Sequence, residues 1–215
     1  MGSANAFAAI RPERTTQLDA GLHYRGAKVQ AWVSAYAGRV QDYIRFSYLA
    51  NGMTRADNVD VQIAGAEAGV DWQPAPQWQL SASLAHAWGR LEDGHAPLAQ
   101  MPPLDGRISV DWQGRRWSAG ALLRAVAAQG RVNPGQGNVT GRDLGPSVGF
   151  ATIGVNAGYR FGDTLQLTAG IDNLFDRAYS EHLNLAGSAD FGYPAEPVRI
   201  AEPGRTAWLK LNYRY

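Results

Sequence analysis

Hydrophobic and polar residues alternate one by one along nine segments of the chain. In VQIAGAEAGVDW, residues 61–72, the alanines, Val70 and Trp72 share one face, while Glu67 and Asp71 share the other. A period of two indicates a half-buried β-strand, because successive side chains of a strand point to opposite sides. The pattern therefore predicts nine strands, at residues 15–24, 29–38, 61–72, 78–88, 107–112, 117–125, 151–161, 165–172 and 206–215.

The predicted strands are long for a soluble protein. Most have about ten residues, whereas strands of soluble sheets usually have about five or six. About ten residues at a steep tilt suffice to cross the hydrocarbon core of a bilayer. Alternation alone leaves two environments open for the apolar face. A soluble β-sandwich or a lipocalin-like barrel shows the same pattern, with inside and outside exchanged.

The connections between the predicted strands alternate in length. The short ones are RGAK, QPAPQ, QGRR and FGD, after strands one, three, five and seven. The long ones cover residues 47–58, 91–105, 130–149 and 176–205. Short turns on one side and long loops on the other are typical of an outer-membrane β-barrel. Aromatic residues at strand ends are expected to form its interfacial girdle, namely Trp72, Trp78, Trp112, Trp117, Tyr159 and Phe161.

Composition removes several other classes of protein. Twenty Lys and Arg against nineteen Asp and Glu give a net charge of +1, and no basic run favours nucleic-acid binding. The 215 residues contain no Cys, which excludes disulfides and thiolate chemistry. No apolar run approaches the ~20 residues of a membrane helix. The first residues, MGSANAFAAIRPER, lack the charged and apolar parts of a signal peptide.

Several stretches resemble motifs of the TonB-dependent outer-membrane receptors. GIDNLFDRAYSEHLN and the terminal EPGRTAWLKLNYRY resemble the carboxy-terminal end of that family. There a strand ends in D/N-N-L-F-D-x-x-Y, and after a long external loop a final G-R-x strand closes on an aromatic residue. RPERTTQLDAGLHY, IAGAEAGVDW and QMPPLDGRISVDW resemble earlier strands and keep the family's order. The stretches YSEHLN and EPGRTAWLKL are most similar to the copper receptors.

The resemblance implies an all-β fold, an antiparallel transmembrane β-barrel. Residues 1–215 are expected to form its carboxy-terminal part, about nine strands of a 22-strand parent. We expect the family's signal peptide, TonB box and plug domain to be absent from this sequence. Counted back from the last strand, the first runs in the same direction, so the two cannot close a regular antiparallel barrel. Open edges are costly in lipid, and we interpret the chain as part of a larger receptor.

Two groups of residues are candidates on the wall itself. In the barrel interpretation the polar face lines the lumen, with Glu67, Arg107, Asp111, Arg124, Asn156 and Arg160. On a soluble sheet the same residues are ordinary surface charges. In the final strand, the resemblance implies a carboxy-terminal assembly signal formed by Leu211, Tyr213 and Tyr215.

Metal ligands are a third candidate group. Copper prefers His and Met ligands, and the predicted ones are His182, Met101 and His95, with His86 and Met53 completing the pool. No two of them stand at a recognisable ligand spacing. A lone His in a loop is more often solvated, and Met next to PPL is also explained by packing at a strand entry.

The favoured function is outer-membrane transport, as the barrel of a TonB-dependent receptor for copper or a metal chelate. No enzyme is indicated: no G-x-S-x-G elbow occurs, and Asp172 and Asp176 stand where a strand turns. No cofactor is expected. The expected partners are outer-membrane lipid, the barrel-assembly machinery and, in the full-length parent, a plug and the TonB system, with no nucleic acid. A small self-standing porin or adhesin and a soluble β-sandwich binding module remain as alternatives.

Overall fold

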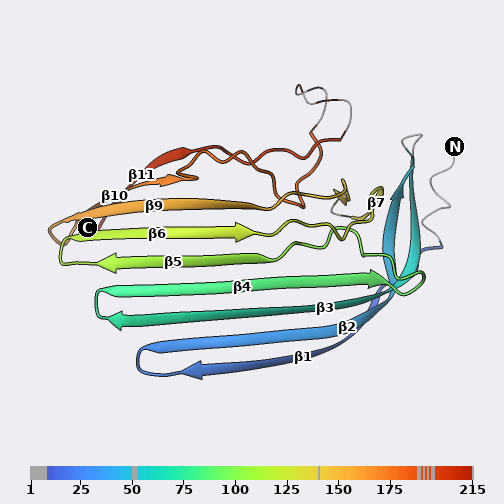
Figure 1. Cartoon of the computed structure of the whole chain (residues 1–215), viewed down its shortest axis with the longest axis horizontal. Coiled ribbons are helices and arrows are strands. Elements are labelled where there is room, and N and C mark those ends of the chain that lie inside the picture. Colours follow the sequence, from blue (N-terminus) through green and yellow to red (C-terminus); the bar gives the residue numbers. More distant parts are fainter. Residues whose placement is uncertain are drawn as a thin grey trace.

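The computed structural model describes residues 9–49, 53–139, 141–187, 190, 192, 194 and 197–214. These residues form one sheet of nine long and two short strands (Figure 1). The long strands are β1 (Arg14–Arg25), β2 (Val29–Tyr48), β3 (Thr54–Ala75), β4 (Trp78–Leu91), β5 (Asp105–Gln113), β6 (Trp117–Val126), β9 (Phe150–Phe161), β10 (Leu165–Asp172) and β11 (Thr206–Tyr213).

The nine long strands form an open antiparallel wall. Each pairs with the next in the order β1, β2, β3, β4, β5, β6, β9, β10, β11. β1 and β11 lie at opposite edges of the wall and run in the same direction (Figure 1). The nine predicted strands and the all-β antiparallel fold are therefore confirmed. We call the side with the short hairpins the turn end and the opposite side the loop end.

β2 and β3 are much longer than the sequence pattern indicated. They have 20 and 22 residues, so most of the predicted loop 47–58 is strand. The pairing shifts between Val40 and Tyr43, where a β-bulge adds one residue to β2. A bulge reverses the phase of the alternation, which hides the continuing strand from a search for period two. Asp42 in this bulge has a φ of 58°, in the left-handed region that Asp tolerates.

Two short strands lie within residues 130–149, which the sequence predicted as a plain loop. They are β7 (Gln136–Asn138) and β8 (Gly141–Arg142). β7 pairs with the outer part of β2, where the Ser47 hydroxyl donates to Gln136 Oε1 at 2.9 Å. Strands of two or three residues are too short to show an alternation. The long loop is therefore folded back onto the β2–β3 hairpin.

The register sorts the side chains of the wall into an apolar face and a polar face. On the apolar face Ala68, Leu84, Gly106 and Ala125 form one row across four strands, and Val70, Ala82, Ile108 and Leu123 form the next. Large side chains of this face are open: Leu18, Leu22 and Leu209 have exposed fractions of 77%, 70% and 70%. Such a surface requires an apolar environment outside the chain.

The wall buries little apolar surface of its own. Its accessible area is 14316 Å², whereas a globular protein of 23.2 kDa would expose about 9,700 Å². The main buried cluster, Val40, Val61, Leu91 and Leu98, lies at the loop end. It belongs to the polar face, because Val40, Val61 and Leu91 pair in a row there. A small core thus holds the loop after β4 against the wall.

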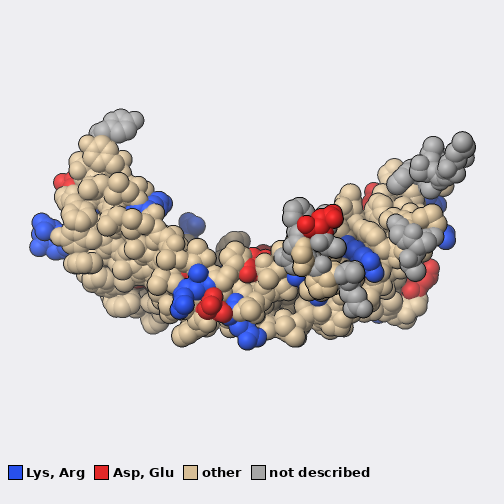
Figure 2. Space-filling view, turned by 90° about the horizontal axis from the view of Figure 1, so that it is seen from above, with Lys and Arg blue, Asp and Glu red and all other residues tan. Residues whose placement is uncertain are grey.

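The overall shape is a bowed plate. Figure 2 shows both ends rising on the same side, with charged side chains in small groups on an otherwise uncharged surface. No helix in the described part of the chain is long and apolar enough to cross a membrane.

Candidate functional site

The polar face carries ordered rows of polar side chains. One row joins Asp111, Gly120 and Asn156 across β5, β6 and β9. Gly120 makes room for its two neighbours, since a Cβ placed there would lie 2.7 Å from Asp111 Oδ1 and 2.9 Å from Asn156 Nδ2. All six predicted lumen residues lie on this face of the sheet: Glu67, Arg107, Asp111, Arg124, Asn156 and Arg160.

Aromatic rings cover glycines elsewhere on the polar face. Trp32 lies over Gly69, where an added Cβ would be 2.5 Å from the indole Nε1. Trp208 covers Gly170 in the same manner. The register explains both contacts, since each ring and its glycine are direct cross-strand partners. In these pairs each ring lies flat over a glycine, so the two Trp side chains project less from the polar face than their size would allow.

Arg124 is the centre of an ionic cluster at the loop end of the polar face. Its guanidinium donates to Asp105 Oδ2 at 2.8 Å from β5 and to Glu181, which comes from the loop between β10 and β11. Arg107 makes a longer contact with Asp105, at 3.4 Å. The side chains of Arg124 and Glu181 have exposed fractions of 23% and 27%. Strand β6 is thereby tied to a loop 57 residues away.

Three further sets of contacts hold the same loop down. The rings of Phe150 and Tyr179 lie 4.2 Å apart between centroids. His182 has an exposed fraction of 5%, and its Nδ1 is 2.9 Å from the Ser147 hydroxyl of the preceding long loop. Arg199 donates to the carbonyl oxygens of Pro146 and His182, each at 2.9 Å. We call this set, with Arg124 and Glu181, the loop latch.

The loop latch was missed at the sequence level. His182 was proposed there as a metal ligand, and the pattern gave no reason to connect it with Ser147. A partial signal existed in Arg199, an isolated cation in a loop rich in apolar residues. The acceptors of its guanidinium are backbone carbonyls, which every residue has, so the sequence does not mark them.

The three predicted metal ligands have separate surroundings. Met101 packs against the buried cluster around Val61. His95 is exposed in the loop after β4 with a φ of 56°. His182 is held in the loop latch. In the described ranges, no group of three or more His, Cys, Asp or Glu is arranged to hold a metal ion. The assignment of His182, Met101 and His95 to a metal stays a prediction.

Burial lowers the pKa of His182 below its ordinary value. The positive charge of Arg199 lowers it further, and Asp143 acts in the opposite direction. Docking therefore favours the neutral imidazole, whose Nδ1 lies 2.9 Å from the Ser147 hydroxyl and 3.5 Å from Arg199 Nη2. Protonation would place a second positive charge beside Arg199.

Acidification should therefore loosen the loop latch. In the undocked loop His182 takes up a proton at about pH 6.5, and in the docked loop only at lower pH. Docking of the loop therefore becomes less favourable as the pH drops below about 6.5. Protection factors from hydrogen exchange of residues 177–187, which correct for the slower intrinsic exchange in acid, should fall when the pH is lowered through this value. A His182→Gln variant should lose the pH dependence, and His95→Gln at an exposed site should keep it. An unchanged profile in His182→Gln would contradict this role.

The apolar face has an aromatic row along the turn end. Trp117 and Tyr159 are 4.7 Å apart between ring centroids, and Tyr159 and Phe161 are 4.6 Å apart. Trp72, Trp78 and Trp112 close the β3–β4 and β5–β6 hairpins at the same end. The predicted girdle residues thus lie together where a membrane interface would be.

The other border of the apolar face lies near Trp88. Arg90 and Arg131 place their guanidinium carbons 5.5 Å and 4.8 Å from its ring. In the adjoining row Gln62 lies between Arg39 and Arg90. From Gln62 to Trp72 the strand covers about 33 Å, or about 25 Å along the normal at a tilt of about 40°, which is the height of a barrel's apolar band.

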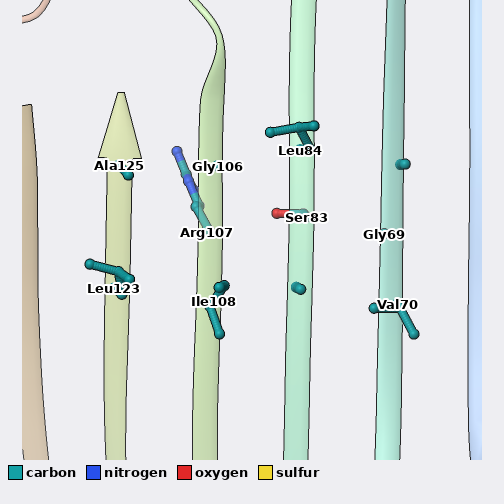
Figure 3. Close-up of a pocket in the computed structure, with 11 residues that line it drawn as sticks. Gly69, Val70, Ser83, Leu84, Gly106, Arg107, Ile108, Leu123 and Ala125 are labelled. Atoms are coloured by element: carbon teal, nitrogen blue, oxygen red, sulfur yellow. The ribbon is translucent and has the colours of Figure 1, made fainter. Parts of the chain in front are cut away.

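Between these borders the apolar face is shallowly hollowed. Leu84, Ile108 and Leu123 project from three neighbouring strands around the small residues Gly106 and Ala125 (Figure 3). The lining suits a hydrocarbon chain, and the polar face is left as the candidate site for polar ligands.

Comparison with known proteins agrees with this geometry. The model of the family described as TonB dependent receptor-like, beta-barrel matches residues 1–174. The structure of the copper transporter OprC superposes with a TM-score of 0.93 and is 48% identical, covering 99% of this chain and 32% of that chain. Curated protein sequences contain no match.

More distant structures share the fold alone. The ferric-catecholate import receptor Fiu from E. coli K12 has a TM-score of 0.71 and 15% identity, covering 96% of this chain and 28% of that chain. The ferric yersiniabactin uptake receptor FyuA from Yersinia pestis has a TM-score of 0.71 and 16% identity, covering 94% and 30%. This chain spans about a third of the length of the relatives.

These comparisons decide between the alternatives that the sequence left open. They favour neither a small porin nor a soluble β-sandwich, and the matched proteins are receptors and transporters rather than enzymes. The chain therefore belongs to the TonB-dependent receptor β-barrel family, whose barrels lie in the outer membrane.

Proposed function

We propose that this chain forms part of the wall of an outer-membrane receptor that takes up copper or a copper complex. The supporting observation is the 48% identity to the copper transporter OprC over 99% of the chain, compared with 15% for the ferric-catecholate receptor. The matched region spans 99% of the chain and so includes the loops and the polar face, which a transported substrate and a plug domain would contact.

The proposal assigns a role to each face of the wall. The apolar face contacts outer-membrane lipid. The polar face, with Glu67, Arg107, Asp111, Arg124, Asn156 and Arg160, lines the lumen and contacts the plug of the full-length receptor. Residues 1–215 are its carboxy-terminal barrel part, and the TonB system acts on the plug rather than on this wall.

The end of the chain is proposed as the signal for the barrel-assembly machinery. Leu211 and Tyr213 lie on the apolar face of the edge strand β11, with exposed fractions of 64% and 68%. Tyr215, the third residue of this signal, is outside the described residues. An edge strand with free backbone groups can be extended by a strand of another protein.

A chimera tests the transport function. Residues 1–215 replace the corresponding third of the copper transporter OprC, and copper accumulation is measured in cells that lack other high-affinity uptake. We expect uptake close to that of the parent, because the two walls share their fold and nearly half of their residues. The same segment grafted into the ferric-catecholate receptor Fiu, at 15% identity, should not support uptake of its substrate. A copper chimera that reaches the outer membrane in normal amount without uptake would overturn the proposal.

A further inference from the structure

A polar pocket lies at the turn end of the wall, next to the edge strand β11. Its polar lining residues are Arg160, Asp163, Thr164, Gln166, Asn212 and Arg214, and Leu165 and Tyr213 complete the lining. The register places Arg160, Gln166 and Asn212 in one row of the polar face. Two guanidinium groups, two side-chain amides and one carboxylate thus surround one opening.

Among the described residues no carboxylate forms an ion pair with the two guanidinium groups of this pocket, although Asp163 is part of its lining. Neither Arg160 nor Arg214 forms an ion pair or a side-chain hydrogen bond with any described residue, and the same holds for Lys210, two positions before Asn212. At the loop end of the same face, Arg124 is bound by both Asp105 and Glu181. The positive charge at the turn end is therefore available to a partner.

The spacing of the cations indicates the size of that partner. Arg214 directly follows β11, and its N–H donates to the Thr164 carbonyl at 2.8 Å, so the alternation continues and places it on the same side as Lys210. The two residues are about 13 Å apart, at about 3.3 Å for each residue. Arg160 lies two strands away from Asn212, a distance of about 10 Å. A single carboxylate or phosphate cannot contact all three. Carboxylates on alternate residues of an extended peptide are about 7 Å apart and can match this spacing.

We propose that this pocket, with Lys210, binds an acidic extended polypeptide segment on the polar face at the turn end. Carboxylates of the segment pair with Arg160, Lys210 and Arg214, and Gln166 and Asn212 donate side-chain N–H groups to it. Guanidinium groups suit this role because their donors match the two oxygens of a carboxylate. The proposal rests on the proposed function only in that the polar face is turned away from lipid.

A lipid headgroup is the less suitable occupant. The residues between these cations on β11, Leu211 and Tyr213, point to the opposite, apolar face. A phospholipid whose chains cover that face would have to pass its phosphate around the edge of the sheet.

Binding of a short fluorescent peptide of alternating Glu and Thr tests the proposal. The full chain is held in neutral detergent micelles at low salt, and anisotropy is measured. The variant Arg160→Gln/Arg214→Gln should weaken binding by about tenfold, because it removes two charge-assisted contacts. The variant Arg160→Lys/Arg214→Lys keeps both charges but loses the paired donors, so its affinity should lie between that of the unaltered chain and that of the Gln variant. The matched control Arg14→Gln/Arg55→Gln removes two exposed charges at the loop end and should change binding by less than about twofold.

Three results would overturn the proposal. They are no binding to the unaltered chain, equal weakening in the test and control variants, and displacement of the peptide by phosphatidylglycerol micelles as effectively as by unlabelled peptide. A negative result of the peptide-binding experiment would not change the result expected for the copper chimera. The two proposals are therefore tested separately.

Discussion

Val155→Arg is expected to lower the free energy of unfolding in a bilayer by about 2–4 kcal/mol, whereas Asn156→Arg should change it little. The two residues are neighbours in β9 and lie on opposite faces, Val155 in a row with Ala121 and Ile171, and Asn156 in a row with Gly120 and Gly170. A guanidinium on the apolar face loses its hydration within the hydrocarbon. On the polar face it stays in water beside Asp111.

The measurement is a denaturant titration of each variant refolded into phospholipid vesicles, followed by tryptophan fluorescence. Both substitutions add one positive charge at neighbouring positions, so the change in net charge is matched. The different strand propensities of Val and Asn account for at most about 1 kcal/mol. Equal losses in both variants would contradict the assignment of the apolar face to lipid.

Leu98→Ala is expected to have the second-largest effect, a loss of about 2–3 kcal/mol in the stability of the loop after β4. Leu98 has an exposed fraction of 6% and packs over Gly89, where an added Cβ would lie 2.8 Å from Leu98 Cδ2. Its backbone N–H also donates to the Gly89 carbonyl at 3.1 Å. Truncation leaves a cavity in a core of only a few side chains, which has little capacity to repack.

Hydrogen exchange of the Leu91 and Leu98 amides reports this loss, since both amides bond within the loop or to the strand. Leu104→Ala, at a site with an exposed fraction of 37%, should cost less than about 1 kcal/mol. Unchanged protection in Leu98→Ala would show that the backbone bonds alone hold this loop.

The sequence predicted the wall well because the wall is repetitive. Polar and apolar residues alternate without interruption in strands such as β9 and β10, and each short hairpin fixes the register of two strands. Whether Val155 or Asn156 lies on the apolar face then depends only on whether its position in the strand is odd or even. The alternation failed at the bulge after Val40, where one added residue reverses the phase.

The loops and the loop latch were not predictable from period or composition. Arg124 was correctly placed on the polar face, but its partner Glu181 is 57 residues away in a segment with no repeat. His182 and Ser147 belong to two different loops, and their contact depends on how both fold. Contacts between such residues can be found only from a known motif or from a three-dimensional structure. The motif in this region, YSEHLN, suggested a metal ligand at His182 instead.

The count of long strands has a consequence for assembly. The described part of the chain has nine long strands, so its two edge strands, β1 and β11, run in the same direction. A closed barrel in which all neighbouring strands are antiparallel has an even number of strands. This wall therefore needs an odd number of further long strands to close in that way. Two copies of this wall around one barrel axis would instead meet at two junctions, in each of which β1 of one copy lies parallel to β11 of the other. The number of strands therefore favours closure by strands of a different sequence over closure by a second copy of this chain.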